Sequence, residues 1–202
     1  ATRFKHELPN YGTFDEVRLF QPGPLPEPII LKGTMIGVPI CEDIWQPDVC
    51  RHLADFGAEI FICINGSPYE IDKDALRIDG VAKRRAAATG LPLAYLNRVG
   101  GQDELVFDGC SMIVDQAGEI AGRGKAFDQD LIVADLDVAA VGRARLAQGR
   151  KKPLPPRVAA LIDRVDVRLP ARKLQSVVVP DLEPPLGRLD EAYRALVLGV
   201  QD

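Results

Sequence analysis

Residues 37–45 contain the residue types of a nucleophilic site. An apolar run leads directly into Cys41, and two acids, Glu42 and Asp43, follow it at once. The thiolate of cysteine is a strong nucleophile, but it forms readily only where a base or a cation lies beside it. A strand that ends in a thiol and two carboxylates is typical of a nucleophile at the mouth of a pocket, although a lone cysteine is more often an inert buried thiol. Cys41 is therefore the first candidate catalytic residue.

Three further segments contain residues that could complete a site. Lys5 opens residues 5–16, residues 65–69 form a turn after an apolar run, and residues 97–109 are rich in glycine and acids. Each has an ordinary explanation when it is taken alone: a surface lysine, a plain turn and a loop. The glycines of residues 97–109 permit close backbone approach, yet the helix that a phosphate-binding loop needs does not follow them. No single segment identifies a function.

These segments need a frame of strands and helices to position them. Apolar runs of strand length fall at residues 35–40, 59–64, 91–96, 111–114 and 131–136. Helical spacing of apolar residues falls at 48–56 and 71–89, and Gly57 and Gly90 are suited to end these helices. A turn at residues 115–118 joins two strands. The alternation of strands and helices, with hairpins late in the chain, predicts an α/β fold in which helices layer mixed sheets.

The composition is that of a globular protein and excludes several classes of function. Apolar residues make up 47% of the 202 residues, and the net charge of −4 argues against nucleic acid as a partner. No apolar run approaches the roughly 18 residues of a membrane span, and the first residues have no signal-peptide layout. The four cysteines form no C-x-x-C pair, and the two histidines complete no zinc pattern. We expect a reduced, cytoplasmic protein without a metal site.

The composition also divides the chain. Residues 1–142 are expected to form one α/β unit, and residues 143–187 are rich in Lys, Arg and Pro. Such a segment cannot build its own core, so it indicates an extended arm or linker, with polyanion binding as the alternative. Residues 188–202 resume helical spacing and are expected to lead into a further domain. The chain opens without an initiator methionine, and we expect additional residues before Ala1 in the longer protein.

In their order and spacing, the four segments resemble the nitrilase superfamily and, more narrowly, the glutaminase domain of the glutamine-dependent NAD synthetase family. LPNYGTFDE after a lysine, ICEDIW, NGSPY and GGQDELVFDG carry this resemblance, which spans residues 1–142 and the helix at 190–202. It implies an α-β-β-α sandwich, here partial, and a homo-oligomer. It also implies that glutamine is hydrolysed and that a second domain, absent here, uses the ammonia with ATP and Mg²⁺ to amidate deamido-NAD.

The resemblance assigns roles to individual residues. Cys41 matches the nucleophile that forms a glutamyl thioester, Lys5 the triad lysine that stabilises the oxyanion, and Glu16 a supporting carboxylate. It assigns glutamine binding to Tyr11, Glu42, Ser67 and Lys73. The family's general base is a glutamate before the lysine, and only residues 1–4 precede Lys5 here. Residues 1–202 alone are therefore expected to lack the roughly 10²–10⁴-fold rate enhancement that general acid–base catalysis supplies.

Two other interpretations remain open at the level of sequence. One is a stand-alone amidase of the nitrilase type, and the other is a non-catalytic scaffold fragment that keeps the fold. The glutaminase hypothesis predicts that the side chains of Lys5 and Cys41 converge on one pocket, with Tyr11 nearby. Their placement on opposite faces of the protein would contradict it.

Overall fold

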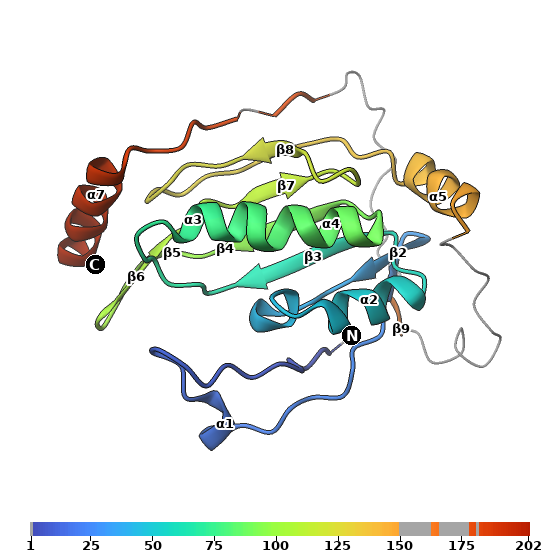
Figure 1. Cartoon of the computed structure of the whole chain (residues 1–202), viewed down its shortest axis with the longest axis horizontal. Helices are drawn as coiled ribbons and strands as arrows, with labels where there is room; N and C mark the ends of the chain where they lie inside the picture. The colour runs from blue at the N-terminus through green and yellow to red at the C-terminus, as the bar shows by residue number, and fades with distance from the viewer. Residues whose placement is uncertain (1, 150–162, 166–177, 181) are drawn as a thin grey trace.

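The computed structural model describes residues 2–149, 163–165, 178–180 and 182–202, and its centre is a seven-stranded mixed sheet (Figure 1). The strand order is β8-β7-β4-β3-β2-β1-β9. In chain order the strands are β1 (Ile29–Leu31), β2 (Thr34–Gly37), β3 (Ile60–Asn65), β4 (Leu93–Asn97), β7 (Met112–Val114), β8 (Ile120–Arg123) and β9 (Asp163–Val165). β2, β3 and β4 run parallel, and β1 pairs parallel with β9. The pairs β1–β2, β4–β7 and β7–β8 are antiparallel. The predicted mixed sheet is confirmed.

A separate hairpin follows β4. It consists of β5 (Val99–Gln102) and β6 (Leu105–Asp108), which pair antiparallel from Val99 opposite Asp108 to Gln102 opposite Leu105. The backbone amide of Tyr69 donates to the carbonyl of Val106 at 2.7 Å. The hairpin is thereby joined to the turn that follows β3.

Helices cover one face of the sheet. α2 (Pro47–Asp55) and a continuous helix built from α3 (Lys73–Ala75), the π-helical η2 (Leu76–Ala82) and α4 (Lys83–Thr89) lie in front of the strands in Figure 1. These are the two helices that the sequence predicted. Gly90 ends the second at φ +67°, a conformation that glycine adopts without strain.

The part of the chain that the structure describes has four further helical elements. They are α1 (Glu16–Leu19), the 3₁₀ turn η1 (Cys41–Ile44), α5 (Val138–Ala147) and α7 (Arg188–Gln201). α7 packs against the β5–β6 hairpin, at the edge of the molecule opposite α5 (Figure 1). No helix among the described residues is both long enough and apolar enough to cross a membrane.

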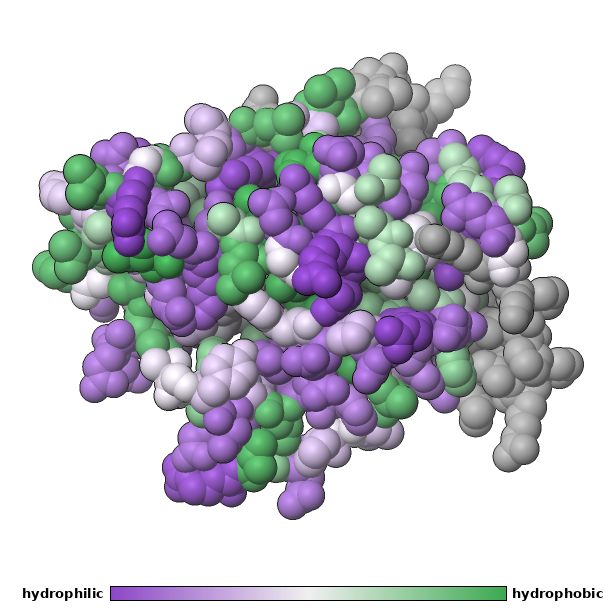
Figure 2. Space-filling view, in the orientation of Figure 1, coloured by the Kyte–Doolittle hydropathy of each residue, from purple (hydrophilic) through white to green (hydrophobic). Residues whose placement is uncertain are grey.

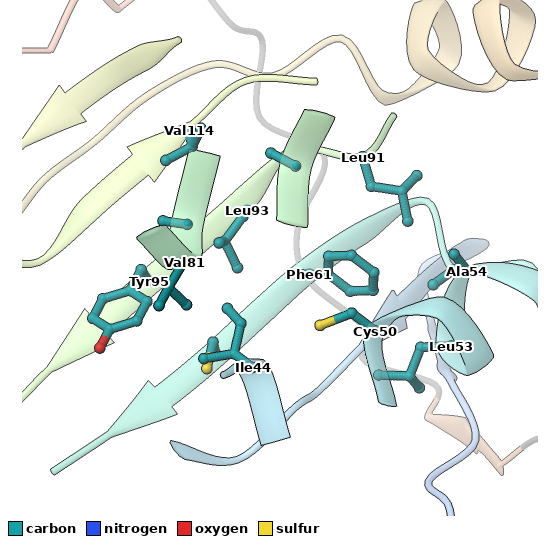
Figure 3. Packing of buried hydrophobic residues seen from close by; sticks show 14 of the residues in the cluster. Ile44, Cys50, Leu53, Ala54, Phe61, Val81, Leu91, Leu93, Tyr95 and Val114 are labelled. Carbon is teal, nitrogen blue, oxygen red and sulfur yellow. The ribbon is translucent and has the colours of Figure 1, made fainter. Parts of the chain in front are cut away.

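The core lies between the sheet and these helices. Phe61, Leu93 and Tyr95 point from the strands toward Leu53 of α2 and Val81 of η2, and all five are almost completely buried (Figure 3). Residues that alternate with them along the strands lie on the other face of the sheet, as the period of two requires. There Ile64 and Leu96 are 44% and 55% exposed. The sheet therefore buries one face much more fully than the other among the described residues.

Two predicted strands differ from the structure. The run at 35–40 forms a strand only as far as Gly37, because Pro39 has no amide hydrogen to continue the ladder. Residues 131–136 run beside β8 without forming a strand, and Leu131 is 83% exposed. The side chain of Asp135 accepts the backbone amide of Val178, so this part of the chain is held by side-chain bonds rather than by a ladder.

The described residues near the predicted domain limits have their own structure. α5 continues through residue 142, and residues 163–165 form β9 alongside β1. Residues 150–162 and 166–177 lie outside the described residues, so the basic, Pro-rich arm stays a prediction. Figure 2 shows hydrophilic and hydrophobic residues interspersed over the helix-covered face. Hydrophobic residues also reach the lower edge near α1, where Val17, Leu19 and Phe20 are exposed.

Candidate active site

Cys41 lies in a tight turn at the end of the parallel strands. Ile40 forms an isolated parallel bridge with Ile64 of β3, and Cys41 then opens η1; we call residues 40–45 the cysteine turn. The backbone of Cys41 has φ +51°, in the left-handed region that side-chain-bearing residues rarely adopt. Such a conformation persists only where its surroundings hold it, and it is common at active sites. The carbonyls of Ile44 and Trp45 accept hydrogen bonds from Arg85, which fixes the far end of the turn.

Lys5 lies on an extended segment beside the cysteine turn. Its Nζ donates to the two carboxylate oxygens of Glu16 at 2.7 and 2.6 Å. The side chains are 16% and 26% exposed, so the pair is half-enclosed rather than buried. We call residues 5–16 the lysine segment. The supporting carboxylate predicted at Glu16 does contact the lysine.

Charged groups of the lysine segment act on the Cys41 thiol. Burial raises the pKa of the Cys41 thiol above its ordinary value, while the Lys5 ammonium and a hydrogen bond from the Gly66 amide lower it. The carboxylates of Glu42 and Glu16 act in the opposite direction and raise it. Because the net direction is upward, the thiol needs a proton acceptor before it can attack at neutral pH.

Tyr11 and Glu42 form a second contact between the lysine segment and the cysteine turn. The Tyr11 hydroxyl donates to Oε2 of Glu42 at 2.7 Å, and Glu42 is only 9% exposed. Burial, followed by the hydrogen bond and charge of Glu42, raises the pKa of the Tyr11 hydroxyl. Tyr11 therefore stays protonated, and it remains a hydrogen-bond donor at any physiological pH.

Ser67 lies in the turn after β3, at residues 65–69, which we call the serine loop. Its backbone amide donates to Oδ1 of Asn97 at 2.9 Å, and its hydroxyl accepts from Nε of Arg77 at 3.2 Å. Arg77 is fully buried and also donates to the carbonyls of Ser67 and Pro68. Since arginine has no acceptor, the Ser67 hydroxyl keeps its own hydrogen free to donate to a ligand.

A buried carboxylate balances Arg77. Nη1 of Arg77 donates to Oδ1 and Oδ2 of Asp108 at 2.8 and 2.6 Å, and Asp108 is 3% exposed. Burial alone would lower the pKa of the guanidinium, but the charge and hydrogen bonds of Asp108 raise it. The sequence analysis missed both residues. In the sequence, Arg77 stands four positions after Lys73, and Asp108 is the aspartate of the phrase FDG. Neither position indicates that the side chain is buried.

Lys73 lies at the start of α3, near the rim of this region. Its Nζ donates to Oε1 of Glu70 at 2.5 Å, and its side chain is 13% exposed against 69% for Glu70. The charge of Glu70 also contributes to the raised pKa of the Tyr11 hydroxyl. The structure thus joins Lys5 to Glu16 and Tyr11 to Glu42 of the cysteine turn. The hydrogen bonds of Ser67 and Lys73 go instead to other residues, Arg77 and Glu70 among them, so their place in the site stays a prediction.

The glycines of residues 97–109 serve packing. A Cβ atom on Gly101 would lie 3.1 Å from Cβ of Asp202, and the Gly101 amide donates to Oδ2 of Asp202 at 2.8 Å. A Cβ atom on Gly199 would lie 3.1 Å from Cγ2 of Val106. These glycines allow α7 to lie directly on the β5–β6 hairpin.

An open cavity of about 460 Å³ lies elsewhere, on the less buried face of the sheet. Leu96, Lys125, Asp130 and Ile132 are among its lining residues, and none of the seven predicted site residues lines it. No group of three or more His, Cys, Asp or Glu side chains within the described ranges is arranged to hold a metal ion. The candidate active site therefore rests on Cys41 and the groups around it.

Known proteins share this sequence and fold. The "Glutamine-dependent NAD(+) synthetase" of Rhodobacter capsulatus is 39% identical over 202 residues, which are 100% of this chain and 31% of that protein. A solved glutamine-dependent NAD+ synthetase from Acinetobacter baumannii, in complex with ADP, is 32% identical with a TM-score of 0.75, covering 98% of this chain and 31% of that one. An amidase from Nesterenkonia AN1, of the nitrilase superfamily, is 30% identical with a TM-score of 0.57, over 72% of this chain and 54% of the amidase.

The chain spans about a third of the length of the curated relatives it matches. The family model described as carbon-nitrogen hydrolase matches residues 2–146, which include the whole candidate site. The predicted nitrilase-like α/β fold is confirmed by the solved neighbours. The chain belongs to the carbon-nitrogen hydrolase family.

Proposed function

We propose that this site hydrolyses the side-chain amide of glutamine through a thioester on Cys41. The observation that carries the proposal is that the two residues after Lys5 bond to Asp43 of the cysteine turn. In addition, the Lys5 ammonium and the Gly66 amide both lower the pKa of the Cys41 thiol. The thiolate attacks the amide carbon, the C–S bond forms, and the C–N bond breaks as ammonia leaves with a proton. Water then hydrolyses the thioester to glutamate and returns the thiol.

The positive groups stabilise the oxygen that gains charge in the tetrahedral intermediate. The Lys5 ammonium and the Gly66 amide are the two groups that lower the pKa of the thiol, and a preorganised donor beside the reacting carbon contributes about 10²–10³-fold in rate. Glu16 holds Lys5 in place through its two short hydrogen bonds. Neither donor has to reorganise during the reaction.

The proton acceptor is proposed to come from residues that precede Lys5 in the longer protein. Among the described residues, the two carboxylates that act on the thiol already have partners: Glu16 accepts from Lys5 and Glu42 accepts from Tyr11. A further carboxylate, with its pKa raised by burial, would take the thiol proton and deliver it to ammonia.

Charges around the turn suit the two ends of an amino acid. Lys73 supplies a cation for the α-carboxylate of glutamine, and Ser67 offers a hydroxyl donor. Glu42 and Tyr11 provide an acceptor and a donor, respectively, for its α-ammonium and amide groups. These assignments favour glutamine over a simple aliphatic amide, which has no charged groups to bind.

In the longer protein we propose that the ammonia supports ATP-dependent amidation of deamido-NAD to NAD. The relatives named as glutamine-dependent NAD synthetases support this, since the chain matches about a third of their length. ATP and Mg²⁺ would act in the synthetase domain, because the glycine-rich hairpin here packs on α7 and forms no phosphate cradle. We also propose that the longer protein acts in the cytoplasm as a homo-oligomer.

The decisive experiment compares nitrogen sources in the protein as its gene encodes it. Cys41→Ala is expected to abolish NAD synthesis from glutamine while synthesis from ammonia stays near the wild-type rate. Equal loss with both nitrogen sources would contradict the proposal.

A stand-alone amidase is the second candidate, favoured by the likeness to the Nesterenkonia amidase. Hydrolysis of butyramide in preference to glutamine would favour it. Inertness toward every amide, in the wild-type protein, would instead favour the non-catalytic scaffold.

A further inference from the structure

Asp43 is a buried carboxylate that none of the proposed roles uses. It is completely buried, two residues after Cys41. Its Oδ1 accepts the backbone amides of His6 and Glu7 at 2.9 and 2.7 Å, and its Oδ2 accepts the amide of Ile40 at 3.0 Å. A buried charge is costly unless hydrogen bonds satisfy it, and here three backbone donors do so.

The three donors flank the two reactive side chains. His6 and Glu7 directly follow Lys5, while Ile40 directly precedes Cys41. We propose that Asp43 is a positioning residue that fixes the ammonium of Lys5 against the thiol of Cys41 by holding both backbones to one carboxylate. The consequence for catalysis rests on the proposed function, but the positioning itself does not.

Few other hydrogen bonds join the lysine segment to the cysteine turn. Among the described residues, the hydrogen bonds that join residues 5–23 to the cysteine turn end on Asp43 or on Glu42. The other bonds of this stretch are internal, such as that from the Gly23 amide to the Lys5 carbonyl at 2.8 Å. Without Asp43, the hydrogen bond from the Tyr11 hydroxyl to Glu42 would be the one left between the lysine segment and the cysteine turn, among the described residues.

Asp43 also closes the turn that holds Cys41. Its own backbone amide donates to the carbonyl of Ile40 at 3.1 Å, while its side chain accepts the amide of Ile40. This reciprocal pair spans Cys41, whose left-handed backbone needs such support. Both actions pass through backbone groups, so Asp43 positions the reacting groups without touching them.

Charge and position predict opposite effects on the thiol. Removal of a nearby negative charge would by itself favour the thiolate and lower the pKa of Cys41. Release of Lys5 would remove a positive charge that lowers the pKa, so the pKa would rise. The direction of the change therefore separates a positioning role from a purely electrostatic one.

The experiment measures the pH dependence of alkylation of Cys41 by iodoacetamide, followed on its own peptide by mass spectrometry. Asp43→Asn loses the charge and turns an amide group toward the Ile40 donor. Asp43→Glu keeps the charge but moves the carboxylate by one methylene. We expect both variants to be alkylated more slowly at pH 8, on the order of tenfold for each unit by which the thiol pKa rises.

Two comparisons complete the design. Asp48→Asn, on the exposed surface of α2, removes the same charge and is expected to change nothing. In a Lys5→Met background, Asp43→Asn is expected to cause no further slowing, because the cation is already gone. Faster alkylation of Asp43→Asn, or slowing that persists in the Lys5→Met background, would overturn the inference.

A measurement on the wild-type protein covers the case in which the variants do not fold. The amides of His6, Glu7 and Ile40 are expected to exchange hydrogen slowly, as protected donors do. Exchange at the rates of free amides would overturn the inference without any substitution. Alkylation and exchange need no glutamine, so an absence of glutaminase activity would refute the proposed function and leave this inference standing.

Discussion

The lysine segment and the serine loop reach the same thiol but are held in different ways. The lysine segment lies near the surface, and its ion pair between Lys5 and Glu16 is half-enclosed. The serine loop follows a central strand and is held by Arg77, which is fully buried and bonds to Asp108 and to the loop carbonyls. One contributes an ionised side chain, the other a backbone amide and a hydroxyl.

The difference follows from what each part supplies. An ammonium must stay charged, and partial contact with water keeps the cost of its charge low. A backbone amide carries no net charge, so its value as a donor depends on exact placement, which a rigid buried clamp provides. Substitutions in the two parts should therefore separate stability from reactivity.

The largest effect on stability is expected from Arg77→Met. It leaves the Asp108 carboxylate buried without its cationic partner, and breaking a buried ion pair costs about 3–5 kcal/mol. Urea denaturation would measure the free energy of unfolding. The matched control, Arg51→Met, removes an exposed pair with Asp48 and should cost less than about 0.5 kcal/mol. Similar losses in the two variants would erase the contrast between clamp and surface pair.

Lys5→Met should have the reverse profile. We expect glutamine hydrolysis to fall by about 10²–10³-fold, as for loss of one oxyanion donor, while stability changes by about 1 kcal/mol or less. The thiol pKa should rise, because the ammonium lowers it, so alkylation of Cys41 should shift to higher pH. Lys83→Met, on the exposed face of the second helix, is the control. A Lys5 variant that loses stability but keeps its rate would contradict the division.

Ser67→Ala tests the serine loop with the smallest change. The hydroxyl accepts from Arg77, which leaves its own hydrogen to donate to a ligand, and one hydrogen bond is worth about 0.5–1.5 kcal/mol. We expect KM for glutamine to rise by up to about tenfold with kcat little changed, as measured by glutamate release. A fall in kcat with an unchanged KM would assign Ser67 to the transition state instead.

The sequence predicted the parts of the fold that depend on local pattern. Both helices of the covered face and the central strands follow apolar periodicity. The seven candidate site residues were assigned by resemblance to a family, and their roles stay predictions. The pairing of β1 with β9 was missed because it joins residues more than a hundred positions apart. Residues 131–136 were predicted as a strand from their apolar run. The prediction was wrong, because an apolar run does not by itself supply a neighbouring strand for the ladder.

The missed residues of the site have a common cause. Arg77, Asp108 and Asp43 are charged residues that become buried, and charge in a sequence ordinarily indicates solvent exposure. Arg77 faces inward from a π-helical turn, a shape that helical periodicity does not anticipate. Asp43 lies two positions after Cys41 in the sequence, but two of its hydrogen-bond partners, Glu7 and His6, are thirty-six and thirty-seven positions away. Only the folded chain shows that Asp43 accepts backbone amides, whereas Glu42 accepts the Tyr11 hydroxyl.

The left-handed backbone at Cys41 sets stability against function at a single position. An L-residue in this region costs roughly 1–2 kcal/mol relative to the common helical conformation, and glycine largely avoids that cost. Selection for thermal stability alone would therefore favour glycine at position 41 and remove the proposed nucleophile. A thermostabilised variant of this protein has to gain its stability elsewhere in the fold.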